Sequence, residues 1–235
     1  MDFSRRKLFA RLLSASLYGI GSSRLIRPVY SDDAPPLSPA KSIYELSGRI
    51  AIDGQKATLN TRIRENSIIE TGRNGKLIFA VGKDAFILRG DSHLEIQGDD
   101  QFIQGLKLVS GALLSVLGGR FQNQSLVMNT TTAIISLRGT GIYVESEPEQ
   151  SYVCTCYGMV ELSSITDPLS REMIKTTHHD LPRYVLLNAP EGKKIREAPV
   201  INHDDDELTL IESLVGRKPP FGSGGYKSTE SNPDR

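Results

Sequence analysis

The spacing of glycines most constrains what this 235-residue chain can fold into. Between residues 42 and 164, turn residues, fourteen of them glycines, recur at intervals of six to ten and separate short apolar runs that are rich in β-branched side chains. These runs are Lys76–Val81, Ala85–Leu88, His93–Ile96, Leu106–Val109, Ala133–Leu137 and Ile142–Val144. None has the ten or so residues of 3.6-residue periodicity that a helix needs. Strands of four to six residues with regular turn signals predict an all-β fold.

Charge is distributed unevenly along the chain. Residues 1–31 hold six Lys or Arg and one acid, so the remainder has 22 basic and 27 acidic residues. Nucleic-acid binding needs a concentrated basic face, and a mildly acidic body argues against it.

The N-terminus is typical of an export signal covering residues 1–31. Arg5 and Arg6 are followed at once by apolar residues, which indicates a twin-arginine signal and a periplasmic destination. Arg11 interrupts the apolar run, and a bilayer-spanning helix needs about 18 uninterrupted apolar residues. We therefore expect no retained membrane span; an N-terminal amphipathic helix is the alternative. Residues 32–41, with three prolines, form an expected stiff linker.

A series of short motifs follows one another from residue 42 to residue 164. The first are Gly48–Gly54, Ile69–Gly72, Leu77–Phe79, Ile87–Ile96 and Leu108–Leu114. The most telling segment then runs from Thr131 to Thr140, with the pattern Thr-x-Ala-x-x-x-x-Arg-Gly-Thr, and a Tyr-Gly-Met-Val segment begins at Tyr157. In order and spacing, this series resembles the FecR-domain family. The resemblance implies a solenoid-like stack of short strands, and it makes Arg138, Gly139 and Thr140 a structural motif rather than a ligand loop.

The best-known members of that family regulate iron-uptake genes from the inner membrane. As the resemblance implies, they join a cytoplasmic sigma-factor-binding region and one membrane helix to this domain in the periplasm. This sequence has the periplasmic part without the other two, so anti-sigma activity is not expected of it. We expect a free-standing, non-enzymatic module that binds a protein or small-ligand partner in the periplasm, in envelope signalling.

Residues 165–221 have a different composition and form an expected C-terminal extension. Arg183–Leu187 predicts a further strand, and apolar residues on one helical face from Leu208 to Val215 predict a short helix. Acidic residues precede that helix, where its dipole favours them, and Gly216 ends it. Residues 222–235 are polar and rich in Gly and Ser, which predicts a disordered tail.

Cys154 and Cys156 are the candidates for chemistry. Residues i and i+2 of a strand share a face, so the two thiols form half of a soft-metal site. Three of the four histidines follow within fifty residues, and His178 or His179 is the expected further ligand, giving a Zn or Cu site.

Two other interpretations of the cysteine pair remain open. The residues could be inert packing, since buried cysteines behave as small apolar side chains. They could also form a redox-labile pair, because a disulfide between i and i+2 would be strained. Nucleophile elbows, His-Glu-x-x-His pairs and phosphate loops are absent from the sequence, so no enzyme activity is expected.

Overall fold

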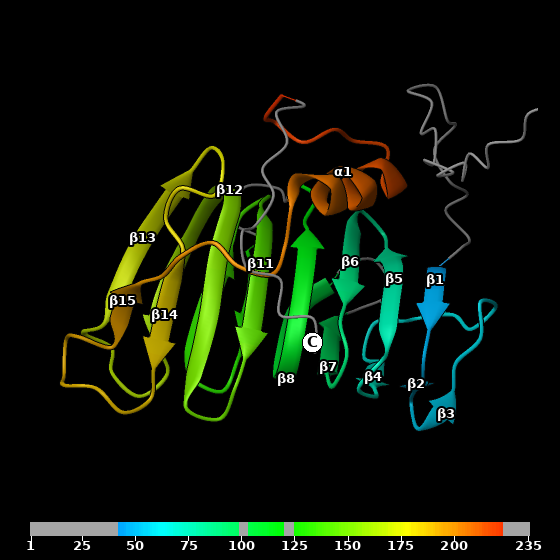
Figure 1. Ribbon diagram of the computed structural model, residues 1–235, viewed down its shortest axis with the longest axis horizontal. Coiled ribbons are helices and arrows are strands. Elements are labelled where there is room, and N and C mark those ends of the chain that lie inside the picture. The colour runs from blue at the N-terminus through cyan, green and yellow to red at the C-terminus, as the bar shows by residue number, and fades with distance from the viewer. Residues whose placement is uncertain (1–41, 99–102, 120–124, 223–235) are drawn as a thin grey trace, which may run out of the picture. The chain divides into compact units, whose positions relative to one another are not determined.

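The computed structural model describes residues 42–98, 103–119 and 125–222; the expected export signal, the expected linker and the expected tail beyond Gly222 lie outside these residues. The described residues form strands and one helix near the C-terminal end (Figure 1). The first strands are β1 (Ile43–Ser47), β2 (Ile50–Ile52), β3 (Gln55–Lys56), β4 (Ile68–Thr71), β5 (Lys76–Val81), β6 (Asp84–Leu88), β7 (His93–Gly98) and β8 (Ile103–Val116). The others are β9 (Leu126–Asn129), β10 (Ala133–Leu137), β11 (Gly141–Ser146), β12 (Gln150–Ser164), β13 (Arg171–Thr176), β14 (Arg183–Leu186) and β15 (Ile195–Glu197), followed by the helix α1 (Asp205–Leu214).

The expected mostly-β architecture with a short C-terminal helix is confirmed. In the described ranges, no helix has the length and apolar character needed to cross a membrane. The boundary expected at residue 164 is the end of β12, and β13, β14 and β15 continue the same sheets beyond it.

Two sheets share two long strands. Sheet A has the order β1-β5-β6-β8-β11-β12-β14-β15, and sheet B has the order β3-β2-β4-β7-β8-β9-β10-β12-β13. The first half of β8 pairs within sheet B and the second half within sheet A, whereas β12 does the reverse. All pairings are antiparallel except that of β8 with β9.

A glycine stands where each shared strand passes from one sheet to the other. Gly111 in β8 has φ +84° and Gly158 in β12 has φ +98°, a region that side chains with a Cβ rarely adopt. A Cβ on Gly111 would lie 2.1 Å from Ser92 Oγ. These glycines let a single strand bend from sheet to sheet without losing its pairing.

The two shared strands correct the expectation of uniformly short strands. β8 has 14 residues and β12 has 15, against the four to six expected. Their halves are buried against different neighbours, and β12 from Ser151 to Tyr157 is buried on both faces. Such a stretch has no alternation of apolar and polar residues, which is the signal that marks a strand in the sequence.

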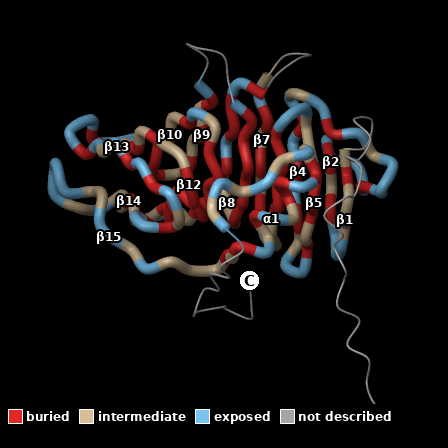
Figure 2. Tube along the Cα trace, turned by 90° about the horizontal axis from the view of Figure 1, so that it is seen from above, coloured by how far each residue is buried: buried red, intermediate tan, exposed pale blue. Residues whose placement is uncertain are grey.

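The main core lies between the sheets. It unites apolar side chains of sheet A, such as Phe86 and Val153, with side chains of sheet B, such as Leu94 and Ile135. Figure 2 shows buried residues concentrated along the middle of the molecule, with exposed residues at the turns. Phe79 and Phe86 stack at this core with ring centroids 4.8 Å apart.

A second apolar cluster lies on the outer face of sheet A, where the C-terminal extension covers it. α1 buries Leu208, Ile211 and Leu214 in this cluster, which also includes residues of β5, β6 and β8. The helix lies near one end of these strands (Figure 1). An isolated helix of ten residues is unstable in water, so docking on the sheet maintains α1. The cluster also includes Cys154 and Cys156, which confirms that both cysteines share one face of β12.

Candidate binding site

The polypeptide between β15 and α1 is held on the outer face of sheet A by hydrogen bonds to side chains of the sheet. Tyr152 Oη donates to the carbonyl of Pro199 at 2.9 Å and accepts from the amide of Ile201 at 3.3 Å. Arg89 Nη2 donates to the carbonyl of Asn202 at 2.7 Å and to both carboxylate oxygens of Glu207 at 2.8 and 3.0 Å. We call residues 198–204 the covering segment.

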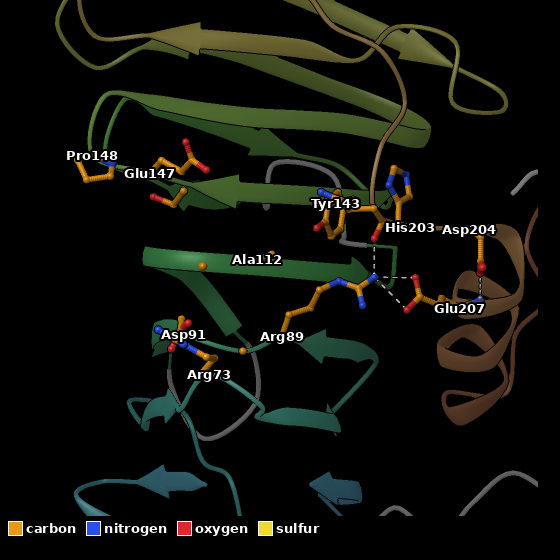
Figure 3. Close-up of a pocket in the computed structure, with 14 residues that line it drawn as sticks. Arg73, Arg89, Asp91, Ala112, Tyr143, Glu147, Pro148, His203, Asp204 and Glu207 are labelled. Atoms are coloured by element: carbon orange, nitrogen blue, oxygen red, sulfur yellow. Dashed lines mark hydrogen bonds and ion pairs between the residues drawn. The ribbon is translucent and has the colours of Figure 1, made fainter. Parts of the chain in front are cut away.

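A cavity of about 440 Å³ lies between the covering segment and sheet A (Figure 3). It is bounded by the middle of β8 at Gly111 and Ala112, by Tyr143 and Ser146 of β11, by the turn after β6 and by the start of α1. Its charged and aromatic lining residues are Arg73, Arg89, Asp91, Tyr143, Glu147, His203, Asp204 and Glu207. This volume falls within the range of about 300–1,000 Å³ that small-molecule sites occupy.

A smaller hollow of about 200 Å³ adjoins the first, since the two share Glu147 and Asn202. Tyr152 and Tyr184 line it, with ring centroids 5.6 Å apart in an edge-to-face arrangement. Glu145 adds a second carboxylate to its wall. The smaller hollow therefore combines aromatic rings with acids, and its lining contains no cationic side chain.

The two hollows together carry an excess of negative charge. Their lining includes five carboxylates, of Asp91, Glu145, Glu147, Asp204 and Glu207, against the guanidinium groups of Arg73 and Arg89. The ion pair of Arg89 with Glu207 neutralises one cation and one anion. Asp204 Oδ1 accepts from the Glu207 amide and so caps α1.

Tyr143 lies at the junction between the hollows and the covering segment. Its hydroxyl donates to Glu145 Oε1 at 2.7 Å, and Asn202 Nδ2 donates to the same oxygen at 2.7 Å. Its ring stacks on His203 with centroids 4.6 Å apart, and Arg89 Cζ lies 5.6 Å from its centroid. Burial, together with the Glu145 carboxylate, raises the pKa of Tyr143, so the hydroxyl stays a donor.

Sequence reasoning did not identify these lining residues. Arg89, Tyr143 and Glu207 come from segments more than fifty residues apart, and each alone is an ordinary charged or aromatic residue. A site assembled by pairing distant strands leaves no local pattern in the sequence. The one signal available was a charged residue directly after a buried strand, as Arg89 follows β6.

The cysteines and two of the histidines converge beside the cavity. His179 Nδ1 lies 3.6 Å from Cys154 Sγ and 3.0 Å from His203 Nε2. One ligand atom from each of Cys154, Cys156, His179 and His203 lies within 4.8 Å of every other. Of the two candidates expected from the sequence, His178 and His179, the structure brings His179 to the thiols, and it adds His203.

His178 has a different environment from His179, although the two are adjacent in the turn between β13 and β14. His178 Nε2 contacts the Asp205 carboxylate at 2.9 and 3.0 Å, and its ring stacks on Phe221. His179 Nε2 contacts Oδ1 of the same carboxylate at 3.1 Å. Asp205 therefore joins the two imidazoles, and the thiol cluster does not include His178.

The two thiols differ in acidity. Hydrogen bonding with Cys156, and then with His179 and His203, holds the pKa of the Cys154 thiol well below its usual range despite burial. Burial raises the pKa of Cys156 instead, and the neighbouring Cys154 thiolate adds to the effect. Cys154 is accordingly the first of the pair to carry negative charge.

The Arg138-Gly139-Thr140 motif lies at the turn between β10 and β11. Gly139 has φ +63°, and Thr140 is fully buried with its carbonyl accepting from the Leu117 amide at 2.9 Å. Arg138 is exposed, with no hydrogen bond or ion pair to the described residues. The motif lines neither hollow.

Comparison with known proteins gives a weak structural likeness. No family model matches the sequence, and no curated protein matches it either. Two crystal structures of a protein from Parabacteroides distasonis ATCC 8503, provisionally described as an anti-sigma factor, align with 12% and 13% identity and TM-scores of 0.46 and 0.45. Each alignment covers 56% of this chain and 58% of that protein, so this chain spans less than two thirds of its length. Such TM-scores are too low to carry a function from one protein to the other.

Proposed function

We propose that this protein is an exported, FecR-like recognition module that binds an organic cation in the joined hollows beside the covering segment. The observation that carries the proposal is the charge of the two hollows. The cavity of about 440 Å³ and the smaller hollow beside it are together lined by more carboxylates than guanidinium groups. The module acts by binding rather than by catalysis.

Aromatic rings and carboxylates are the groups that recognise ammonium and guanidinium ions. A cation over the face of a tyrosine ring gains about 0.5–2 kcal/mol, depending on how far it is desolvated. Tyr152 and Tyr184 supply such rings in the smaller hollow, and Glu147 lies where the two hollows meet. A ligand with a positively charged end in the smaller hollow and a second polar end in the larger one fits this lining.

The proposed setting is the periplasm. Two sequence features support it: the Arg5-Arg6 pair, which is typical of an export signal, and the FecR-like series of motifs. The solenoid-like stacking that the resemblance implies is part of the same proposal. The partner in that setting is a small organic cation or a protein that presents a Lys or Arg side chain. The proposed role is envelope signalling.

A diamine tests the proposal. Putrescine has two ammonium groups, and 1,4-butanediol has the same length without charge. We expect isothermal titration calorimetry to detect putrescine binding to the wild type and no binding of the diol. Glu147→Gln should weaken putrescine binding about tenfold, because a hydrogen bond to a charged group contributes about 1.5–3 kcal/mol.

Glu149→Gln is the matched control. Glu149 is exposed two residues further along the same turn and lines neither hollow, so its variant should bind putrescine as the wild type does. If both variants weaken putrescine binding equally, the effect comes from the overall charge of the protein and not from Glu147. Equal binding of the diamine and the diol would exclude a cation site.

A further inference from the structure

We infer that Cys154, Cys156, His179 and His203 bind one Zn²⁺ ion in a closed tetrahedral site that fastens the covering segment to sheet A. This goes beyond the proposed cation binding, because the ion is a structural ligand of the protein. The four residues come from β12, from the turn after β13 and from the covering segment. Their exposed fractions are 0% for both cysteines, 4% for His179 and 2% for His203.

The separations between ligand atoms suit a tetrahedral zinc ion. Zn–S bonds of about 2.3 Å and Zn–N bonds of about 2.0–2.1 Å place a sulfur and a nitrogen about 3.6 Å apart, and two nitrogens about 3.3 Å apart. The distance from Cys154 Sγ to His179 Nδ1 is 3.6 Å, and that from His179 Nδ1 to His203 Nε2 is 3.0 Å. Only small side-chain movements separate this arrangement from ion coordination.

Hydrogen bonds on the far sides of the two imidazoles determine which nitrogens carry protons. His203 Nδ1 lies 2.6 Å from the Ile201 carbonyl oxygen, which can only accept, so Nδ1 carries a hydrogen. His179 Nε2 donates in the same way to the Asp205 carboxylate at 3.1 Å. When both rings are neutral, the lone pairs of His179 Nδ1 and His203 Nε2 therefore face each other, and neither nitrogen has a hydrogen to donate to the Cys154 thiolate. Such an arrangement needs a cation between the nitrogens.

A shared proton would satisfy the two nitrogens, but a metal ion satisfies the nitrogens and both sulfurs at once. The Asp205–His179 contact is moreover the carboxylate–histidine arrangement that commonly orients a zinc ligand from behind. Thiolate and imidazole are the usual ligands of structural zinc.

Charge and coordination number favour Zn²⁺ over Cu⁺. Two thiolates and two neutral imidazoles carry a charge of −2, which Zn²⁺ neutralises and Cu⁺ does not. An uncompensated charge is costly in a site as buried as this one. Four protein ligands also complete the tetrahedron and leave no open position for a substrate, so the site is structural.

The position of His203 gives the ion its role. Its imidazole stacks on Tyr143, and its backbone lies between Asn202, which lines both hollows, and Asp204, which caps α1. An ion bound to His203 and to β12 therefore anchors the wall of the cavity and the first turn of the helix.

Metal content of the purified full-length protein tests the inference. We expect inductively coupled plasma mass spectrometry to find one zinc per chain, and His203→Gln to lose it. His178→Gln should retain zinc, because His178 lies outside the thiol cluster, and so should His93→Gln, because His93 is on β7 beside Glu70 and Glu95. Loss of zinc from His178→Gln with retention by His203→Gln would overturn this ligand set.

Cobalt substitution tests the site in wild-type protein, so its result does not depend on whether a variant folds. Wild-type protein freed of zinc and loaded with Co²⁺ should show the intense visible absorption of a tetrahedral ion and charge-transfer bands from thiolate sulfur. Zinc-free wild type that neither rebinds zinc nor gives this spectrum would overturn the inference and leave a proton between the imidazoles. The putrescine titration is a separate measurement, so a failure of the cation site and a failure of the zinc site are distinguishable.

Discussion

Gly158 and Gly139 both have positive φ, but their surroundings differ. At Gly158 a Cβ would lie 2.6 Å from Thr140 Cγ2 and 3.0 Å from the carbonyl oxygen of Gly139. At Gly139 the nearest heavy atom to a Cβ would be Gly119 Cα at an ordinary 3.5 Å. Substitution therefore adds a steric clash to the backbone strain at Gly158, and backbone strain alone at Gly139.

We expect Gly158→Ala to destabilise the protein more than Gly139→Ala. An Ala in the left-handed region costs about 1 kcal/mol, and the clash at Gly158 adds to that figure. Urea denaturation of the two variants beside the wild type measures both losses. A Gly158→Ala variant as stable as Gly139→Ala would show that the close contact with Thr140 adds nothing to the backbone strain.

The histidines show what a sequence can and cannot predict at a site. The spacing of Cys154 and Cys156 places both thiols on one face, which depends only on strand geometry. The difference between His178 and His179 depends on the turn after β13, where His179 has φ +53°. The approach of His203 depends on the path of the covering segment across the sheet, and no local pattern encodes that path.

At the scale of elements, α1 is positioned by its first turn as well as by its apolar face. Asp204 is extended, with φ −141°, and its side chain accepts from the Glu207 amide at 2.9 Å. At the other end, Tyr157 Oη donates to Glu212, whose other oxygen accepts from Arg217 Nε at 2.6 Å. The polar contacts at each end therefore complement the burial of Leu208, Ile211 and Leu214 between them.

Loss of the cap should weaken the protein measurably. We expect Asp204→Ala to reduce the free energy of unfolding by about 1 kcal/mol, because one amide of the first turn loses its acceptor. Asp204→Asn keeps an oxygen that can accept the same hydrogen bond and should lose much less. Thermal denaturation of the two variants compares them, and equal losses would assign the effect to charge rather than to capping.

Most short elements could be predicted from the sequence, whereas the long ones could not. The apolar runs Lys76–Val81 and Ala133–Leu137 coincide with β5 and β10, because Gly and polar turn residues bound them on both sides. The helix expected near Leu208 is α1, since its apolar face has a clear period. β8 and β12 were missed as continuous strands because each has a glycine where a strand would be expected to end.

For the whole molecule, the layers follow from which faces are apolar. Sheet B packs on sheet A through the main core, and the C-terminal extension packs on the outer face of sheet A. Sheet A is thus covered on both faces, which explains why every residue of β6 and β11 is buried. The proposed zinc and cation sites both lie at the second of these interfaces, where the extension meets the sheet.

The sharing of β8 and β12 by both sheets has a consequence for cooperativity. Opening sheet A breaks the pairings of one half of β8 and one half of β12. The other half of each strand, which pairs in sheet B, is then no longer fixed at one end. The sheets should consequently form a single foldon. Native-state hydrogen exchange should give similar opening free energies for the amides of Leu113 in sheet A and Leu106 in sheet B. A sheet A that exchanges through a separate, lower-energy opening would instead show that Gly111 and Gly158 isolate the two halves of each strand.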